Sequence, residues 1–332
     1  MKISSLLALV LLIAGVARAG ETPNPALVVL EKADRSLIIV DPATLQIVAR
    51  VPVGLDPHEV VVSADGRTAY VSNYGAFGTG GPGHTIAVVD LVAQKPLAPI
   101  DLGPLLAPHG LDFAGGELYF TAEGSKAIGR YNPATHKIDW VMGTGQDRTH
   151  MVRVFFNPAD IFTSNVASGS ISIFQEVESG TRTDWHITVV PVGGGSEGFD
   201  VTADRSQLWV ANADDGTISI IDIGQKKVVQ TIPDSVKHAN RLQFTRDGKY
   251  ALISDLKSND LTVLDVASLS VFKKIPLGSP SEGILIAPDG KLAYVALGPG
   301  NAVDVIDLAT WTVSGKIQTG HGPAGMAWAV RK

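Results

Sequence analysis

The sequence predicts an all-β protein, a seven-bladed β-propeller, on three observations. Short runs of Val, Ile, Leu and Tyr bounded by Gly- and Asp-rich turns dominate residues 20–332, and few segments show a helical period. A strand start that follows a Pro- or Gly-rich turn recurs seven times, every 41 to 51 residues, which is the spacing of propeller blades. The two ends of the chain are complementary fragments of a single blade.

Each recurring start places one residue at the same position of the repeat. Six of the seven residues at this position are His, Glu or Asn, although the segments around them are apolar. In a propeller, these starts lie where each blade meets the central channel, so we expect the seven residues to form a ring at its mouth. The aligned residues are His58, His109, His150, Glu197, Asn240, Glu282 and Ala324.

A complete repeat contains four predicted strands. In the first repeat they cover residues 59–64, 68–73, 85–91 and 97–103, and Asp65-Gly66 forms the turn between the first two. The same Asp-Gly turn recurs at Asp247-Gly248 and Asp289-Gly290. Four strands in a meander correspond to one blade.

The ends of the chain predict how the ring closes. Residues 26–54 contain the second, third and fourth strands of a blade but no first strand, whereas residues 324–330 form a first strand with nothing after it. We expect the C-terminal strand to pair with the three N-terminal strands, because this removes edges that are prone to aggregation. The prediction is one propeller domain over residues 20–332.

Residues 1–19 have the pattern of a secretory signal peptide. Lys2 precedes an apolar run at residues 6–16, and Ala17-Arg18-Ala19 is a small-x-small cleavage site. The run is shorter than an ordinary bilayer-spanning helix, and no other run of spanning length follows. We expect a periplasmic or secreted soluble protein without a membrane span, and a monomer because a closed ring has no free edges.

Charge and cysteine content exclude several function classes. The formal net charge is −6, and −8 once Lys2 and Arg18 are removed, so nucleic acid is not an expected partner. The chain has no cysteine, which excludes disulfides, thiolate metal sites and c-type haem attachment. We expect neither haem nor an Fe–S cluster.

The second strands carry a family resemblance. Tyr70-Val71-Ser72-Asn73 and its repeats Phe162-Thr163-Ser164-Asn165 and Trp209-Val210-Ala211-Asn212 resemble the YVTN-type β-propeller repeat. Such propellers are similar to the lactonase superfamily, and His150-Met151-Val152 with Phe156-Asn157-Pro158 looks like a strand start of 6-phosphogluconolactonase-like proteins. The resemblance implies the fold, but it does not transfer a function, because members include surface proteins, binding proteins and enzymes.

The predicted mouth suggests two kinds of chemistry. His58, His109 and His150 come from consecutive blades, and three imidazoles with an open position can hold a divalent metal ion. Without metal, the same groups are suited to proton transfer. The candidate ligand-binding residues are Glu59, Glu197, His238, Asn240 and Glu282, and the candidate catalytic residues are Glu282, Arg153 and Arg241.

A purely structural interpretation competes with both. Polar groups at this position can satisfy turns and line a water-filled channel, and Glu197 and Glu282 each precede a glycine. The loop at residues 73–84, longer than its counterparts, is expected at the same mouth as a flap or a tolerated insertion. The aspartates that end the third strands are expected to cap turns; they are Asp41, Asp90, Asp222, Asp265 and Asp307.

Two functions lead, and a third class, an accessory subunit to a redox partner, also stays open although the sequence contains no cofactor motif for it. The leading hypothesis is an exported propeller that binds an unknown small molecule or protein at its His-rich mouth. The alternative is a lactonase- or lyase-type enzyme that uses a divalent metal at the same mouth.

Overall fold

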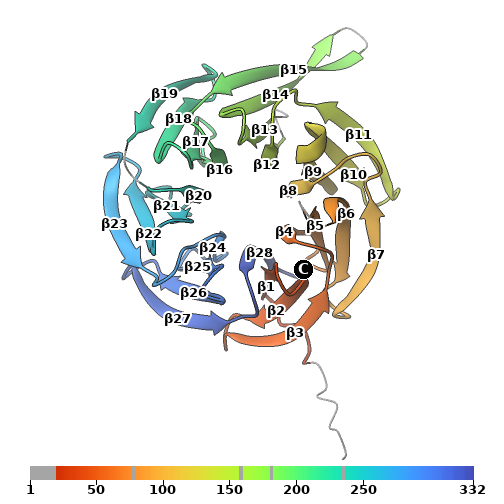
Figure 1. The fold of residues 1–332 in the computed structure, drawn as a ribbon, viewed down its shortest axis with the longest axis vertical. Helices are drawn as coiled ribbons and strands as arrows, with labels where there is room; N and C mark the ends of the chain where they lie inside the picture. Colours follow the sequence, from red (N-terminus) through yellow and green to blue (C-terminus); the bar gives the residue numbers. More distant parts are fainter. Residues whose placement is uncertain (1–19, 77–79, 157–159, 180–181, 234–235) are drawn as a thin grey trace, which may run out of the picture.

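The computed structural model describes residues 20–76, 80–156, 160–179, 182–233 and 236–332. Seven four-stranded antiparallel sheets are arranged as blades around a central axis, as Figure 1 shows, which confirms the predicted seven-bladed propeller. The predicted signal peptide, residues 1–19, lies outside the described residues, so it stays a prediction.

Six blades consist of four consecutive strands each, with the first strand innermost. The described strands of these blades, together with one 3₁₀ turn, are β4 (Pro57–Val62), β5 (Thr68–Ala76), β6 (Gly81–Asp90) and β7 (Lys95–Asp101); β8 (Pro108–Ala114), β9 (Glu117–Ala122), η1 (Glu123–Ser125), β10 (Ala127–Asn132) and β11 (Lys137–Gly143); β12 (Thr149–Phe155), β13 (Asp160–Asn165), β14 (Ser170–Ser179) and β15 (Arg182–Pro191); β16 (Ser196–Val201), β17 (Gln207–Asn212), β18 (Thr217–Asp222) and β19 (Lys227–Ile232); β20 (Ala239–Phe244), β21 (Tyr250–Asp255), β22 (Asp260–Asp265) and β23 (Ser270–Pro276); and β24 (Ile284–Ile286), β25 (Leu292–Leu297), β26 (Ala302–Asp307) and β27 (Thr312–Gln318).

The seventh blade joins the two ends of the chain. Its strand order is β28-β1-β2-β3, so β28 (Pro323–Ala329) supplies the innermost strand beside β1 (Ala26–Glu31), β2 (Ser36–Asp41) and β3 (Gln46–Pro52). Strand β28 pairs antiparallel with β1 from Ala26↔Ala329 to Glu31↔Pro323. The predicted closure by the C-terminal strand is confirmed.

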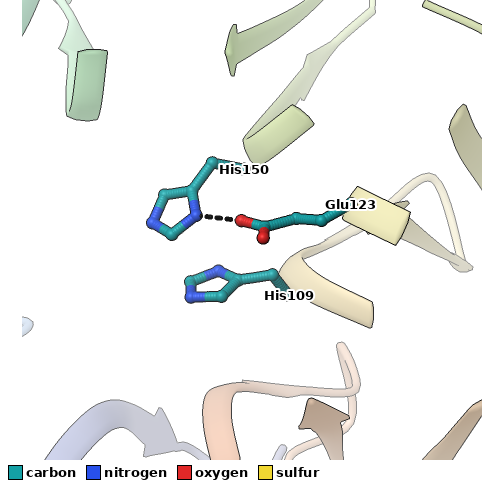
Figure 2. A group of neighbouring side chains, drawn as sticks. All are labelled: His109, Glu123 and His150. Carbon is teal, nitrogen blue, oxygen red and sulfur yellow. Dashed lines mark hydrogen bonds and ion pairs between the residues drawn. The ribbon is translucent and has the colours of Figure 1, made fainter. Parts of the chain in front are cut away.

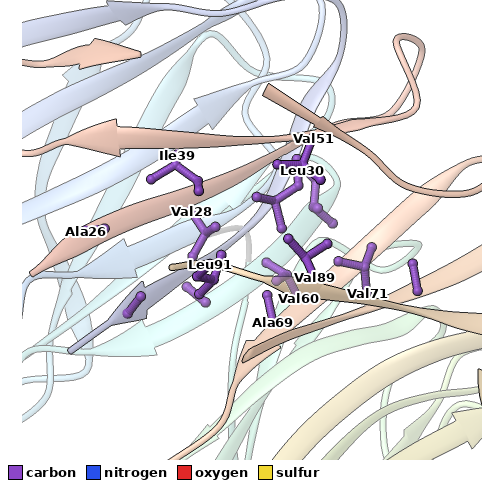
Figure 3. Packing of buried hydrophobic residues seen from close by; sticks show 14 residues of the cluster. Ala26, Val28, Leu30, Ile39, Val51, Val60, Ala69, Val71, Val89 and Leu91 are labelled. Atoms are coloured by element: carbon purple, nitrogen blue, oxygen red, sulfur yellow. The ribbon is translucent and has the colours of Figure 1, made fainter. Parts of the chain in front are cut away.

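Burial explains why the middle strands read as continuous apolar runs. Both faces of β1 and most of β2 are buried, because each blade is covered by a neighbouring blade on either side. Figure 3 shows one such interface, where Val28 and Leu30 of the closing blade lie near Val60, Val71 and Val89 of the next. Outer strands such as β11 alternate between exposed and half-buried residues, since only one face meets another blade.

The aspartates that end the third strands cap turns, as expected. Asp41 Oδ1 accepts a hydrogen bond from the Ala43 amide at 2.9 Å, and the hydroxyl of Thr44 donates to Oδ2. The equivalent carboxylates of Asp90, Asp222, Asp265 and Asp307 accept amide hydrogen bonds in the same way.

Side chains on the innermost strands also link neighbouring blades. Asp112 Oδ2 accepts from the Val154 amide at 2.8 Å, and Asp200 Oδ2 accepts from the Phe244 amide at 3.0 Å. The side-chain Oε1 of Gln243 accepts from the Ile286 amide at 3.0 Å. These bonds fix the angular position of each inner strand, and therefore of the residues at its start. Within the described residues, no helix is long and apolar enough to cross a bilayer.

Candidate functional site

The seven aligned residues converge on one cavity at the end of the channel where the inner strands begin. This mouth cavity has a volume of about 200 Å³. All seven aligned positions line it, from His58 to Ala324, and so do Glu59 and Arg241 from the neighbouring position of two inner strands.

A β-bulge at the start of the inner strands turns these residues toward the axis. The pairing of β4 with β5 shifts between Pro57 and Val60, so two residues escape the regular ladder. The amide of Glu59, which the bulge leaves unpaired, donates to Ser72 Oγ at 3.0 Å. The Ser or Thr of the repeated second-strand motif therefore supports the bulge, and the same contact is made by Thr121, Ser164 and Ser254.

An ion pair across the channel forms the floor of the mouth cavity. Arg241 on β20 bonds to Glu59 on β4 through Nη2 and Oε1, and its Nη1 lies 3.7 Å from Glu197 Oε2. At the rim, Lys32 Nζ donates to Glu282 Oε2 at 2.5 Å. Both pairs connect residues far apart in the sequence, so the charged groups hold the mouth in one arrangement.

His150 lies between two carboxylates. Its Nδ1 is 2.5 Å from Glu123 Oε1 and its Nε2 is 2.8 Å from Glu197 Oε2, although the second contact is not aligned as a hydrogen bond. The Tyr74 hydroxyl donates to Glu123 Oε2 at 2.5 Å, and Arg148 Nε lies 3.6 Å from the same oxygen. The carboxylate of Glu123 thus connects a histidine, a tyrosine and an arginine.

These contacts separate the pKa values of the histidines. Burial alone lowers the pKa of His150, but the negative charges of Glu197 and Glu123 outweigh it and raise the pKa to about 9. Burial would likewise raise the pKa of both carboxyl groups, yet His150 holds the pKa of Glu197 down at about 2 and lowers that of Glu123. In the arrangement described here, His150 is an imidazolium flanked by two carboxylates.

The other two histidines are neutral. Burial, with the charge of Lys32, lowers the pKa of His58 to about 3, and burial next to His150 holds the pKa of His109 well below its usual range. His58 Nδ1 lies 3.1 Å from the Asp56 carbonyl oxygen; a carbonyl only accepts, so the proton is on Nδ1 and Nε2 keeps its lone pair. His109 Nδ1 is buried and has no hydrogen-bond partner among the described residues.

The structure groups possible metal ligands differently from the sequence prediction. In the part of the chain that is described, His109, Glu123 and His150 form a buried group whose possible ligand atoms all lie within 4.8 Å of one another. Figure 2 shows the imidazoles of His109 and His150 one above the other, with Glu123 reaching His150 from the side; the ring centroids are 3.7 Å apart. His58 contacts His109 at a centroid distance of 4.8 Å but is not part of this group.

Two predicted residues lie outside the mouth cavity. Arg153 lines a second cavity of about 380 Å³ further along the inner strands, where Asp112 and Asp200 flank it and Nη2 is 3.9 Å from Asp200 Oδ1. Each residue of a strand advances about 3.3 Å, so a position three residues after His150 lies too far down the channel. His238 is half-buried before β20 and does not line the mouth cavity.

Comparison with known proteins agrees with this architecture. Residues 108–290 match the family model described as YNCE-like beta-propeller, which is more than half of the chain. The chain belongs to the YNCE-like β-propeller family. This agrees with the lactonase-like propeller resemblance seen in the sequence. No curated protein sequence matches the chain.

Solved structures similar to this YNCE-like propeller share its fold at low sequence identity. A functionally unknown protein from Desulfotomaculum acetoxidans has a TM-score of 0.76 at 13% identity, covering 93% of this chain and 100% of its own. A protein from Bacteroides fragilis provisionally described as a 6-phosphogluconolactonase has a TM-score of 0.72 at 15% identity, with 92% and 98% covered. Hydrazine synthase from Kuenenia stuttgartiensis has a TM-score of 0.69 at 17% identity, with 82% and 89% covered.

Four residues of this YNCE-like site were not among the predicted site residues, although the loop that contains Tyr74 was expected at the mouth. Lys32, Tyr74 and Arg148 line the mouth cavity, and Glu123 lies buried behind it. Lys32, Tyr74 and Glu123 occupy the same position of the repeat. Each directly follows the residue in the second strand of its blade that pairs with the first residue of the innermost strand. Three other blades have the apolar residues Val166, Ala213 and Leu256 at this position. The polar residues at the same position could therefore have identified these site residues from the repeat itself.

Proposed function

We propose that the protein binds a small polar molecule in the mouth cavity. The observation that carries this proposal is the convergence of all seven aligned residues on one cavity of about 200 Å³. Six of these seven residues are His, Glu or Asn, and one of the histidines has a buried ring nitrogen without a hydrogen-bond partner among the described residues.

The lining argues for the chemical class of the ligand. Imidazole, amide, phenol, guanidinium and carboxylate groups surround the cavity, and Leu256 is the one large aliphatic side chain among the described lining residues. The volume lies below the range typical of drug-sized ligands, so a small, hydrogen-bonding molecule such as a hydroxy acid, a sugar or a lactone fits best.

A small molecule is favoured over a protein partner by where the charges lie. The side chains of Glu59, Glu197 and Arg241 are 12–17% exposed and are fixed by one another, so they face the cavity more than an outer surface. We also propose that the protein is exported and monomeric; the signal-peptide pattern of residues 1–19 and the closed ring support this. A protein partner would be indicated by co-purification that does not depend on the cavity residues.

A lactonase- or lyase-type enzyme is the second candidate. It is supported by histidines and carboxylates in one cavity, and by the fold likeness to the Bacteroides fragilis protein provisionally described as a 6-phosphogluconolactonase. In this mouth, Arg241 is held by Glu59 and Glu282 by Lys32, so both are better placed to position a substrate than to exchange protons. Turnover of sugar lactones by the native chain but not by H150A would favour this candidate.

Ligand capture tests the leading proposal. The native chain, the cavity variant H58A/N240A and the surface control H84A/H321A are purified identically, and small molecules released on denaturation are identified by mass spectrometry. His84 and His321 are exposed and lie outside the cavity. We expect a polar compound that accompanies the native chain and the control, with at least tenfold less in the cavity variant.

Two results would contradict the proposal. One is the same compound in equal amount with the cavity variant, which would place binding elsewhere. The other is no enriched compound together with no shift in melting temperature on adding hydroxy acids, sugars or lactones.

A further inference from the structure

We propose that His109, Glu123 and His150 hold a divalent transition-metal ion at the wall of the mouth cavity. The starting observation concerns His109, a residue that is only 3% exposed. Its Nδ1 atom is buried and has no hydrogen-bond partner among the described residues. A buried polar atom without a partner costs free energy, so it indicates a ligand at this place. His150 and Glu123 are the neighbours that offer further donor atoms, all within 4.8 Å.

The donor set suits metals of intermediate softness. Two imidazole nitrogens with one carboxylate oxygen are known both for catalytic zinc and for non-haem iron(II), and they leave positions open for water or another ligand. Such ligands lie about 2.0–2.2 Å from the ion, so the side chains of the 4.8 Å group would have to turn toward one another when the ion binds. The ion would take the place of the proton between His150 Nδ1 and Glu123 Oε1, which are 2.5 Å apart.

Partners that would orient the ligands are already in place. Tyr74 donates its hydroxyl to Glu123 Oε2 at 2.5 Å, which leaves Oε1 for the ion. Glu197 Oε2 lies 2.8 Å from His150 Nε2 without hydrogen-bond alignment, so a small turn of the ring would let Nε2 donate to this carboxylate while Nδ1 coordinates the ion. Histidine ligands in metal sites usually have such a carboxylate or carbonyl behind them.

The three residues come from adjacent elements that the fold holds rigidly. His109 lies on β8, Glu123 opens the η1 turn after β9, and His150 lies on β12 of the next blade. The Thr121 hydroxyl accepts from the Gly110 amide and donates to the His150 carbonyl oxygen at 2.8 Å, which ties the two inner strands together beside the site. The ligand backbone is therefore positioned before any ion arrives.

His58 is assigned a different role. Its Nδ1 donates to the Asp56 carbonyl and it lies outside the 4.8 Å group, so it lines the cavity without completing the metal site. An ion pair of His150 with its two carboxylates explains His150 without metal, but it leaves His109 Nδ1 without a partner among the described residues. The difference between His58 and His109 gives the sharpest test.

The measurement is zinc content and affinity of the full chain. Protein purified without nickel or chelator is analysed by plasma mass spectrometry, and the chelator-treated chain is titrated with Zn²⁺ by calorimetry. We expect about one ion per native chain, the same in H58A and in the surface control H84A, and at least a hundredfold weaker binding in H109A and E123Q. Equal binding in H109A, or loss in H58A, would overturn the assignment.

A second readout covers variants that fail to fold. Co²⁺ added to the chelator-treated native chain is expected to give the strong visible absorption of a four- or five-coordinate site, displaced by one equivalent of Zn²⁺. Weak absorption like that of the hydrated ion would overturn the proposal without any variant.

The metal site extends the proposed function, because His109 and His150 line the cavity in which we propose that the small molecule binds. In that respect the metal proposal rests on the proposed function. The two can fail separately. Native protein that carries no metal as purified and binds neither Zn²⁺ nor Co²⁺ on titration, but still captures the small molecule, rejects the metal site alone. A chain with stoichiometric metal and no captured molecule rejects the ligand proposal alone.

Discussion

At the scale of single residues, the site depends on Glu123. Its carboxylate accepts from the Tyr74 hydroxyl, neutralises His150 and lies near Arg148, while its own side chain is 3% exposed. A buried charge network of this kind is stabilising only while every member is present, because removal of one leaves the others desolvated and unpaired.

The substitution E123Q tests this dependence. In metal-free protein, we expect it to lower the free energy of unfolding by about 3 kcal/mol, since a neutral amide cannot balance the buried imidazolium of His150. Urea unfolding of native, E123Q and the exposed control E176Q measures the difference. A loss in E123Q no larger than in E176Q would show that the network does not stabilise the fold.

At the scale of elements, Glu31 joins the two ends of the ring. Its buried carboxylate accepts from Arg50 Nε and Nη2 at 2.7 and 2.9 Å, from Ser36 Oγ at 2.5 Å and from the Gly320 amide at 2.6 Å. It therefore links β1 to its partners β2 and β3 and to the segment that leads into β28. Burial would raise the pKa of this carboxyl, but these hydrogen bonds outweigh burial and lower it.

The substitution E31Q is expected to weaken closure in a pH-dependent manner. A lowered folded-state pKa means that the carboxylate stabilises the protein fully above the usual value of 4.5 and loses this effect as the pH falls through the folded value. E31Q should cost about 3 kcal/mol at pH 7. The gap between native and variant chains should narrow as the pH drops below 4.5.

Urea unfolding at several pH values, with the exposed E178Q as control, measures this gap. A gap that is constant from neutral pH down to the acid limit of folding would contradict the ionic role of Glu31.

At the scale of the whole molecule, closure leaves the two ends of the described part of the chain, from residue 20 to residue 332, next to each other. The side chain of Asn24 donates to the Arg331 carbonyl oxygen at 3.0 Å and accepts from the Arg331 amide at 2.8 Å. Adjacent ends allow a circular permutant, whereas a missing inner strand opens an edge on β1 and removes the cover of neighbouring blades.

A pair of chains tests the closure directly. Deletion of residues 323–332 is expected to give aggregation or loss of the cooperative transition, because β28 and its core contacts are removed. A permutant that joins residues 20 and 332 by a short Gly-Ser linker and opens between Gly193 and Gly194 should keep the ring. Size-exclusion chromatography with circular dichroism compares them, and a deletion variant that stays monomeric with an unchanged melting curve would contradict the closure.

Sequence reasoning could predict the fold because it rests on local, repeated signals. Turn residues, the strand period and the incomplete blades at either end can each be recognised from a few neighbouring positions in the sequence. The ring of seven residues then follows from the repeat. His58, His109 and His150 were placed at one mouth because each follows the same turn.

The chemistry within the mouth could not be predicted in the same way. The contacts of Glu123 with His150 and Tyr74 join three blades, and their distances depend on how blades pack rather than on the repeat. Arg153 was predicted near the mouth but lines the second cavity, because it lies three residues further along the inner strand than His150. Comparing only the first residues of the strands does not show this displacement along the channel. Charge pairs such as Arg241 with Glu59 span 182 residues and leave no local signal.

We propose the mouth cavity as the binding site of this propeller. The most direct measurement is a crystal structure of protein purified without chelator and soaked with the small molecule that the native chain captures. We expect density for that molecule against His58, Asn240 and Arg241, within the cavity of about 200 Å³. Density for the molecule elsewhere on the propeller, with only solvent in the mouth cavity, would contradict it.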